Sequence, residues 1–326
     1  MTAIGIPITK AMNNDTKGTL KTIKYIEELG IQAVWMTTGP GHAGPFINMD
    51  ALTVFSASSV QTDRILMGTS IVPILPRHPI VIAQQVQVLD ELSGGRFRLG
   101  IGTGHKKTMH TSIGHPFNSP LAQLSEYLQI LKTLFKKGSV SFNGKFYQAQ
   151  VEMPSAINVP VIASALGPKS FQLCGSMADG AISWLCPWQY LKDVALPQMK
   201  VGAKTTNRNV PPLIAHVPVL AGATIEQTRE AMRQHVSTNP KNAEFANMFR
   251  AAGLDEVDNG EWSDRMIDSV ALYGDQDQII EGLKRLQSIG ASEIIASPIP
   301  FGDNIQASIK YTIQVLATGQ RIIDSN

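Results

Sequence analysis

Residues 93–105 read SGGRFRLGIGTGH, and the alternating glycines in this stretch decide between two folds. A Rossmann dinucleotide loop has the pattern G-x-G-x-x-G/A and joins the first strand of a sheet to a helix. Counted from Gly100 and Gly102, this pattern requires Gly or Ala at position 105, where the chain has His105. The residues that follow, KKTMHTSIGHPFNSP, do not read as the start of a helix. The stretch therefore excludes a Rossmann loop and predicts a buried strand instead.

Similar short apolar runs recur along the chain. We expect strands at 3–8, 33–38, 66–73, 97–104, 160–166, 180–186, 213–220 and 293–299. Amphipathic stretches with helical spacing lie between and after them, at 19–30, 81–95, 120–135, 224–236, 277–290 and 305–319. Strands that alternate with helices form parallel sheets, and eight such units make a TIM barrel. We predict an α/β fold with a single (β/α)8 barrel over residues 1–326.

Two segments exceed a minimal barrel. Residues 139–150 alternate apolar and polar side chains around Asn143 and Gly144, a pair suited to a type I′ turn, so we expect a hairpin after the fourth helix. Residues 237–268 read as one or two helices between the seventh and eighth strands. Insertions of this length serve as lids or interfaces, or they simply extend the packing. The sequence leaves these alternatives open.

Composition narrows the class of protein. Hydrophobic residues make up 43% of the chain and charged residues 17%, with a net charge of only +2, which argues against a nucleic-acid partner. The two cysteines, Cys174 and Cys186, lack metal or disulfide spacing, so we expect a reducing cytoplasm. No signal peptide and no membrane-spanning run is read from the sequence. These features predict a cytoplasmic globular protein.

The expected strand ends are poor in charged groups. Hydroxyl side chains dominate there, at Thr37, Thr38, Ser70, Thr103, Ser164 and Ser183. No Lys, Asp or Glu lies in the carboxyl-terminal half of any expected strand. Schiff-base aldolases, glycosidases and metal hydrolases all need such residues at the barrel mouth. The sequence therefore predicts no metal and an organic cofactor that brings its own reactivity.

Two glycine-containing segments are candidates for binding that cofactor. In an extended strand Gly100, Gly102 and Gly104 face one side, either to let a flat ligand approach the backbone or to relieve crowding inside the barrel. After the fifth strand, Gly167 leads into a helix that opens with Lys169, and free N–H groups there suit a phosphate. An ordinary turn with Pro at the first helical position is the alternative.

At this point the residues resemble a known family, the luciferase-like flavin and deazaflavin oxidoreductases, and most closely its F420-dependent branch. The matching motifs are GTSIVPILPRHPIVIAQQ (68–85), GGRFRLGIGTGH (94–105), IGHPFNSPLAQLSEYL (113–128), ASALGPKSFQLCGSMADGAISWL (163–185) and GDQDQIIEGLKRLQSIGASEII (274–295). The resemblance implies a cofactor ring over the barrel mouth, backed by a cis peptide bond between Ser70 and Ile71. It also implies a homodimer.

The residues and the resemblance together give a predicted cofactor site. It comprises Thr38, Ser70, Ile71, Gly102, Thr103, Gly104, His105, Ala165, Leu166, Gly167, Lys169 and Ser170. Two positions depart from relatives: Thr37 and Thr38 replace an Asp-His pair, and His105 replaces the Glu of sugar-phosphate dehydrogenases. The second departure makes glucose-6-phosphate an unexpected substrate.

Histidines and aromatic residues complete the prediction. His105 either moves the proton that accompanies hydride transfer or only contacts the cofactor. We expect His78 to cap a helix and His216 to be a core residue whose hydrogen bonds are satisfied. Six large side chains near strand ends either line a substrate cavity or, for the first two, fill the core: Trp35, Met36, Phe46, Met109, Trp184 and Trp188.

These observations favour an oxidoreductase that transfers a hydride between coenzyme F420 and a small organic substrate. Two alternatives remain open at this stage. The same barrel could bind FMN and use molecular oxygen as a monooxygenase, or it could bind a flavin without turnover. We expect a small-molecule substrate and neither a nucleic-acid nor a membrane partner.

Overall fold

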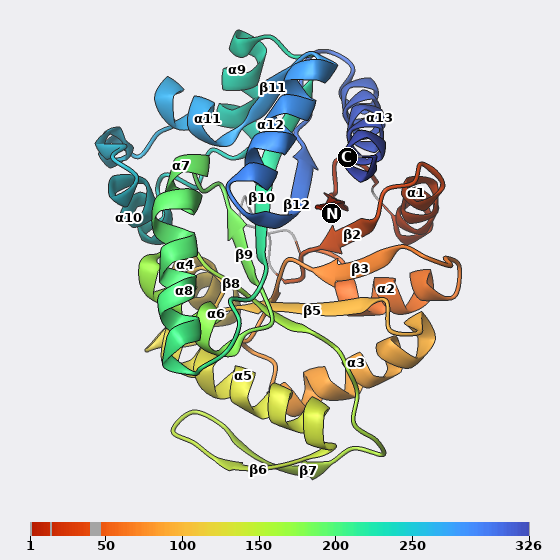
Figure 1. Ribbon diagram of the computed structural model, residues 1–326, viewed down its shortest axis with the longest axis vertical. Coiled ribbons are helices and arrows are strands. Elements are labelled where there is room, and N and C mark those ends of the chain that lie inside the picture. The colour runs from red at the N-terminus through yellow and green to blue at the C-terminus, as the bar shows by residue number, and fades with distance from the viewer. Residues whose placement is uncertain (1, 14, 40–46, 326) are drawn as a thin grey trace.

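Eight parallel strands close into a barrel in the computed structural model, which describes residues 2–13, 15–39 and 47–325 (Figure 1). In order around the barrel, the strands are β1 (Ala3–Pro7), β2 (Ala33–Met36), β3 (Leu66–Thr69), β5 (Phe97–Gly102), β8 (Val161–Ser164), β9 (Ala181–Trp184), β10 (Leu213–Ala221) and β12 (Ala291–Pro298). Pairing of β9 with β10 and of β12 with β1 closes the ring. The predicted TIM barrel is confirmed.

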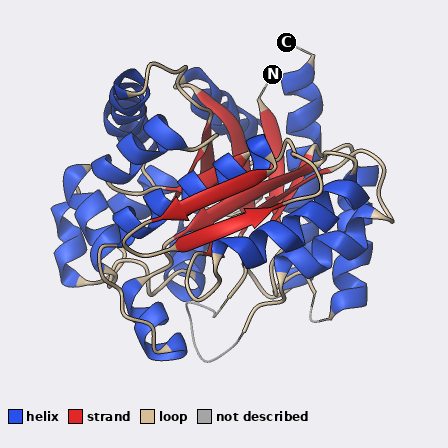
Figure 2. Cartoon of the chain, turned by 90° about the horizontal axis from the view of Figure 1, so that it is seen from below, coloured by secondary structure: helices blue, strands red, loops and turns tan. Residues whose placement is uncertain are grey.

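Helices surround the strands, which occupy the centre of the view in Figure 2. They are α1 (Thr16–Glu28), α2 (Ala51–Ser59), α3 (Pro79–Ser93), α4 (Lys106–Ile113), α5 (Pro120–Lys137), α6 (Pro168–Met177), α7 (Trp188–Tyr190), α8 (Leu196–Thr205), α9 (Ile225–His235), α10 (Ala243–Ala251), α11 (Asp264–Val270), α12 (Gln276–Ser288) and α13 (Ile305–Asp324). A π-helical turn (Leu191–Ala195) joins α7 to α8. None of the helices in the described residues has the length and apolarity to cross a membrane.

One prediction about the glycine stretch was wrong. Helix α4 begins at Lys106, directly after the strand, at a position where the sequence predicts no helix. His105 occupies the N-cap position without a side-chain cap bond, and the helix ends after eight residues at Gly114, whose φ is 70°. Its start carries neither a capping side chain nor an acidic residue, so the usual helix-start signals are missing. The closed barrel, rather than the missing helix, excludes the Rossmann loop.

The barrel interior is filled by side chains at alternate strand positions. Trp35 is fully buried, and its ring passes so close to Gly5 and Gly68 that a Cβ at either glycine would lie within 2.6 Å of it. At the amino-terminal end of the strands, Trp35 Nε1 donates a 2.8 Å hydrogen bond to Glu293, which also pairs with Arg98. The arginine stacks 4.6 Å from the indole centroid. This group fills the interior of the barrel.

The predicted hairpin is present, but its turn is shifted. Strands β6 (Ser139–Asn143) and β7 (Gln148–Glu152) pair in antiparallel register and project below α5 in Figure 1. The Gly144 N–H donates to the Tyr147 carbonyl at 2.9 Å, so the tip lies two residues after the expected Asn143–Gly144 pair. The carboxylate of Glu126 on α5 accepts hydrogen bonds from three backbone N–H groups of the turn. This tertiary contact sets the turn.

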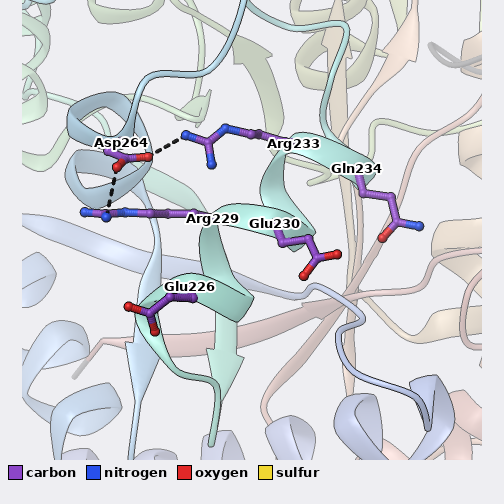
Figure 3. Close-up of a pocket in the computed structure, with 6 residues that line it drawn as sticks. All are labelled: Glu226, Arg229, Glu230, Arg233, Gln234 and Asp264. Carbon is purple, nitrogen blue, oxygen red and sulfur yellow. Dashed lines mark hydrogen bonds and ion pairs between the residues drawn. The ribbon is translucent and has the colours of Figure 1, made fainter.

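The predicted helical insertion lies between β10 and β12. It contains α10, a 3₁₀ turn (Asp255–Asn259) and α11, and it ends in a short extra strand, β11 (Leu272–Gly274), that pairs with β10. Arg229 and Arg233 of α9 form ion pairs with Asp264 of α11 (Figure 3). Arg229 also pairs with Asp268 of the same helix. These ion pairs hold α11 of the insertion against α9, the helix that follows β10.

Candidate functional site at the barrel mouth

The carboxyl ends of the strands bring a compact set of side chains to the barrel mouth. A Cβ at Gly102 would lie 2.3 Å from Ser164 Oγ and 2.7 Å from Ile71 Cδ1, which shows that β5, β8 and the segment after β3 converge there. Across the β9–β10 pair, the rings of Trp184 and His216 lie 4.2 Å apart. Ile71 packs against the buried apolar cluster of the barrel centre, which is made by Ala33, Trp35, Ile162, Ile182, Ile214 and Ile295.

The predicted cis peptide bond between Ser70 and Ile71 is present. It lies between β3 and the two-residue strand β4 (Val72–Pro73), where the chain bulges out of the barrel ladder. Backbone bonds hold the bulge to the end of β2: the Ser70 N–H donates to Met36 O at 2.8 Å, and the Thr38 N–H donates to Ile71 O at 3.1 Å. The Ser70 Oγ is buried and has no hydrogen-bond partner in the described part of the chain.

Thr69 bridges the gap that the bulge opens beside β5. Its hydroxyl donates to Gly100 O at 2.7 Å and accepts from the Gly100 N–H at 2.8 Å. Thr69 is fully buried, so these two bonds replace strand pairing where β3 and β5 separate. The sequence does not mark Thr69 as a site residue, because a threonine inside a strand carries no sign of such a role.

The glycines of β5 relieve crowding inside the barrel. A Cβ at Gly100 would lie 1.8 Å from the Thr69 carbonyl oxygen, so this position makes room for the bulge. Gly102 likewise makes room for Ile71 and Ser164. The prediction that Gly104 belongs to the same strand face was wrong: β5 ends at Gly102, and Gly104 adopts a φ of 68° beside Met109.

In the loop after β8 there is free space beside the backbone of Gly167, and the hydroxyl of Ser170 already makes hydrogen bonds within the loop. A Cβ at Gly167 would meet no atom within 4 Å, and Lys169 is exposed in the first turn of α6. Ser170 Oγ donates to Gly167 O at 2.7 Å and accepts from the Leu166 N–H at 3.1 Å. Pro168 stands in the first turn of the helix. The loop therefore has the turn with Pro at the first helical position that was the alternative to a phosphate site. It also leaves space for a ligand beside the backbone of Gly167.

The remaining predicted contacts surround these segments. The Thr38 hydroxyl accepts the N–H of Ala51 at 2.7 Å, at the start of α2. The Thr103 hydroxyl donates to the next carbonyl at 3.2 Å. Ala165 extends the pairing of β8 through a 2.9 Å bond from its N–H to Ile182 O. Thr38 and Ala165 are buried, whereas Thr103 and Leu166 are half-buried.

His105 lies between β5 and α4, half-buried under the helical insertion. Its ring centroid is 5.5 Å from that of Phe245 on α10. Burial lowers the pKa of His105 below 6.5, so the imidazole is neutral at neutral pH. The insertion thus reaches a predicted site residue, a contact that the sequence could not assign.

The other histidines divide between a confirmed and a corrected prediction. His78 caps α3, since its Nδ1 accepts the Ile80 N–H at 3.2 Å. His216 is buried in β10, as expected, but its Nε2 has no hydrogen-bond partner among the described residues. Its hydrogen bonding is therefore not satisfied.

The aromatic residues have different surroundings. Trp35 and Met36 fill the core. Met109 is buried, and Trp184 and Trp188 are half-buried. Phe46 lies outside the described residues.

Two other kinds of site have little support here. No group of three His, Cys, Asp or Glu side chains is placed to hold a metal within the described ranges. The surface hollow of Figure 3 is lined by Glu226, Arg229, Glu230, Arg233, Gln234 and Asp264. Its arginines pair with aspartates of α11, so they stabilise the insertion.

The fold and mouth define a parallel barrel whose strand ends offer hydroxyls, glycines, aromatic rings and neutral imidazoles. A model of the luciferase-like monooxygenase family matches residues 4–293. The chain therefore belongs to that family.

Individual relatives extend the comparison. The 5,10-methylenetetrahydromethanopterin reductase of Methanolobus tindarius is 24% identical over 314 residues, covering 88% of this chain and 91% of the relative. An F420-dependent secondary alcohol dehydrogenase, solved with an F420–acetone adduct, superimposes with a TM-score of 0.81 at 17% identity over 97% of both chains. The FMN complex of the oxygenating constituent of 3,6-diketocamphane monooxygenase, from the CAM plasmid of Pseudomonas putida, gives a TM-score of 0.69 at 15% identity over 98% of both chains.

Proposed function

We propose that the protein is an oxidoreductase that transfers a hydride between coenzyme F420 and a small organic substrate. One observation supports this most directly: the described strand ends at the mouth present no charged side chain, and burial lowers the pKa of both His105 and His216. Strand ends of this kind supply no strong acid, base or cation to the reacting atoms, so redox chemistry there needs a bound coenzyme. The F420-dependent secondary alcohol dehydrogenase supports F420 as that coenzyme.

The mouth residues fit a flat ring with an anionic tail. The bulge at Ser70 and Ile71 would support one face of the ring, and the buried Ser70 hydroxyl, which has no partner in the described residues, would bond a polar atom of it. The open backbone at Gly167, with Lys169 beside it, would hold a phosphate. Bound F420 supplies the hydride or accepts it, and the chain positions both reactants.

His105 is the proposed proton carrier. Because its imidazole is neutral at neutral pH, it can accept a proton from an alcohol or relay one to a carbonyl through its two nitrogens. Phe245 packs against the ring and limits its motion and its contact with water. This arrangement matches a proton step that accompanies hydride transfer.

Titration of the purified protein with F420 and with FMN tests the proposal. We expect F420 to bind, with a change in its visible absorption, and its reduced form to be oxidised by at least one member of a panel of ketones, imines and enones. Tight FMN binding without a response to F420 would refute the proposal and favour the monooxygenase alternative, which the FMN-bound neighbour supports. Binding of either cofactor without turnover across the panel would favour a flavin-binding protein without enzymatic activity.

We also propose that the protein forms a homodimer through α2 and α3, in the reducing cytoplasm. Val81, Val88 and Leu92 of α3 and Val60 at the end of α2 are exposed, between 43% and 66%. Val81, Val88 and Leu92 recur at helical spacing, so they form an apolar stripe on α3, beside α2, that a second copy would cover. Sedimentation should give twice the chain mass, and Val88→Glu should give a monomer; a wild-type monomer at micromolar concentration would refute the dimer.

A further inference from the structure

The imidazole of His216 is buried in β10, and one of its two nitrogens is unpaired in the part of the chain that the structure describes. Only 8% of this residue is exposed, and its Nε2 finds no partner among the described residues. Leaving a buried polar atom unpaired destabilises the folded state, so such an atom in a folded protein calls for an explanation. A ligand atom at the barrel mouth would supply the missing bond.

The neighbours of His216 give the wall around it an uncharged character. The ring centroids of Trp184 on β9 and His216 are 4.2 Å apart, and Ile295 of β12 pairs in register with His216 on the other side. Burial lowers the pKa of His216 to about 3, so the side chain carries no charge at neutral pH. This wall therefore offers an indole surface and one neutral hydrogen-bonding atom.

The position of this wall relative to the bulge determines what it contacts. Around the closed ring, β3 is the third strand and β10 the seventh, so they lie on opposite sides of an eight-stranded barrel. A coenzyme ring supported by the Ser70–Ile71 bulge would therefore turn its other face toward β9 and β10. That face is the one that a substrate can approach.

We propose that Trp184 and His216 form a substrate subsite for small, uncharged, cyclic or flat molecules that carry one hydrogen-bonding atom, such as ketones and secondary alcohols. This inference rests on the proposed function for the placement of the coenzyme. The indole packs against the apolar part of the substrate, and His216 Nε2 bonds its oxygen. An anionic substrate is disfavoured at this wall, because burying its charge there meets no cation on β9, β10 or β12 at the mouth.

Binding measurements on three variants test the subsite. Wild type, His216→Gln and His216→Phe are titrated with cyclohexanone, methylenecyclohexane and cyclohexanecarboxylate, with and without F420. Glutamine retains an amide near the Nε2 position, whereas phenylalanine keeps a ring without a polar atom. Binding is followed by NMR of ¹⁵N-labelled histidine, with the His216 signal assigned by its loss in His216→Phe.

We expect cyclohexanone to shift the His216 signal and to bind wild type roughly five- to tenfold more tightly than either analogue, as one hydrogen bond predicts. His216→Phe should reduce this preference to within about twofold, and His216→Gln should retain it. An unshifted His216 signal, equal binding of the carboxylate, or an undiminished preference in His216→Phe would overturn the proposal. Because these measurements need no hydride transfer, their outcome is separate from that of the F420 titration.

Discussion

Replacing Thr69 by valine tests whether one hydroxyl holds the bulge at the barrel mouth. Valine has nearly the same shape but cannot bond the N–H and carbonyl of Gly100, which lie 2.8 and 2.7 Å from the hydroxyl. Thr69 is fully buried, so water cannot replace the lost bonds. Each of the two unpaired groups costs about 1–3 kcal/mol, and the greater hydrophobicity of valine offsets part of this, so we expect the folded state to lose roughly 2–4 kcal/mol in all.

For a chain of 326 residues this loss corresponds to a fall in Tm of about 3–6 °C. Thr69→Ser is the matched control, because it keeps the hydroxyl and removes only a methyl group, at a cost of about 1 kcal/mol. Thermal unfolding followed by circular dichroism measures both variants. Valine should also weaken F420 binding, since the bulge is the proposed support for the coenzyme ring.

The order of the two variants is the decisive result. If hydrophobicity alone mattered at this buried site, the valine variant would have the higher Tm, whereas the hydroxyl bridge predicts the higher Tm for the serine variant. A Thr69→Val protein that melts at or above the temperature of Thr69→Ser would refute the bridge and the reasoning built on it.

Four further predictions concern other parts of the site and core. His105→Ala should lower kcat by at least about 10²-fold with little change in Tm; unchanged turnover would remove its proton role. Lys169→Glu should raise the Kd of F420, and no change would exclude this side chain as a phosphate contact. Glu293→Gln should leave the Arg98 charge buried and unpaired, and should lower the free energy of unfolding by about 3–5 kcal/mol, which calorimetry can measure. The double variant Arg98→Met/Glu293→Gln is the control, because removing the charge as well should restore part of this loss. Burial lowers the pKa of His216 to about 3, so between pH 6.5 and pH 3 the unfolded chain binds one more proton than the folded chain, and the free energy of unfolding decreases as the pH falls. The Tm of His216→Phe should therefore decrease less than that of wild type between pH 7 and pH 4.5. Equal decreases would contradict the lowered pKa of His216.

The arrangement of strands and helices could be predicted because it follows from local patterns. Each expected strand coincides with one that forms, since apolar runs of strand length recur between amphipathic segments. The limits were less predictable: the strand expected at 66–73 divides into β3 and β4 around the bulge. That division depends on the Thr69 bridge to a neighbouring strand, which no local pattern encodes.

The site was only partly predictable, for a similar reason. The position of His216 within an expected strand predicted that it would be buried. Whether its nitrogen finds a partner depends on β9 and β12, which bring Trp184 and Ile295 beside it. Likewise, the contact between His105 and Phe245 joins residues about 140 positions apart, beyond the reach of any spacing rule. The hairpin turn shifted because Glu126 binds its backbone from another element.

Arg98, Glu293 and Trp35 pack together inside the barrel, where Trp35 is fully buried. Because these side chains fill the interior, a molecule bound at the mouth has no path along the barrel axis. Product must therefore leave by the route through which the next substrate arrives, and the two have to take turns. For such an enzyme, the rate at which product clears the entrance sets an upper limit on turnover, whatever the speed of the chemical step.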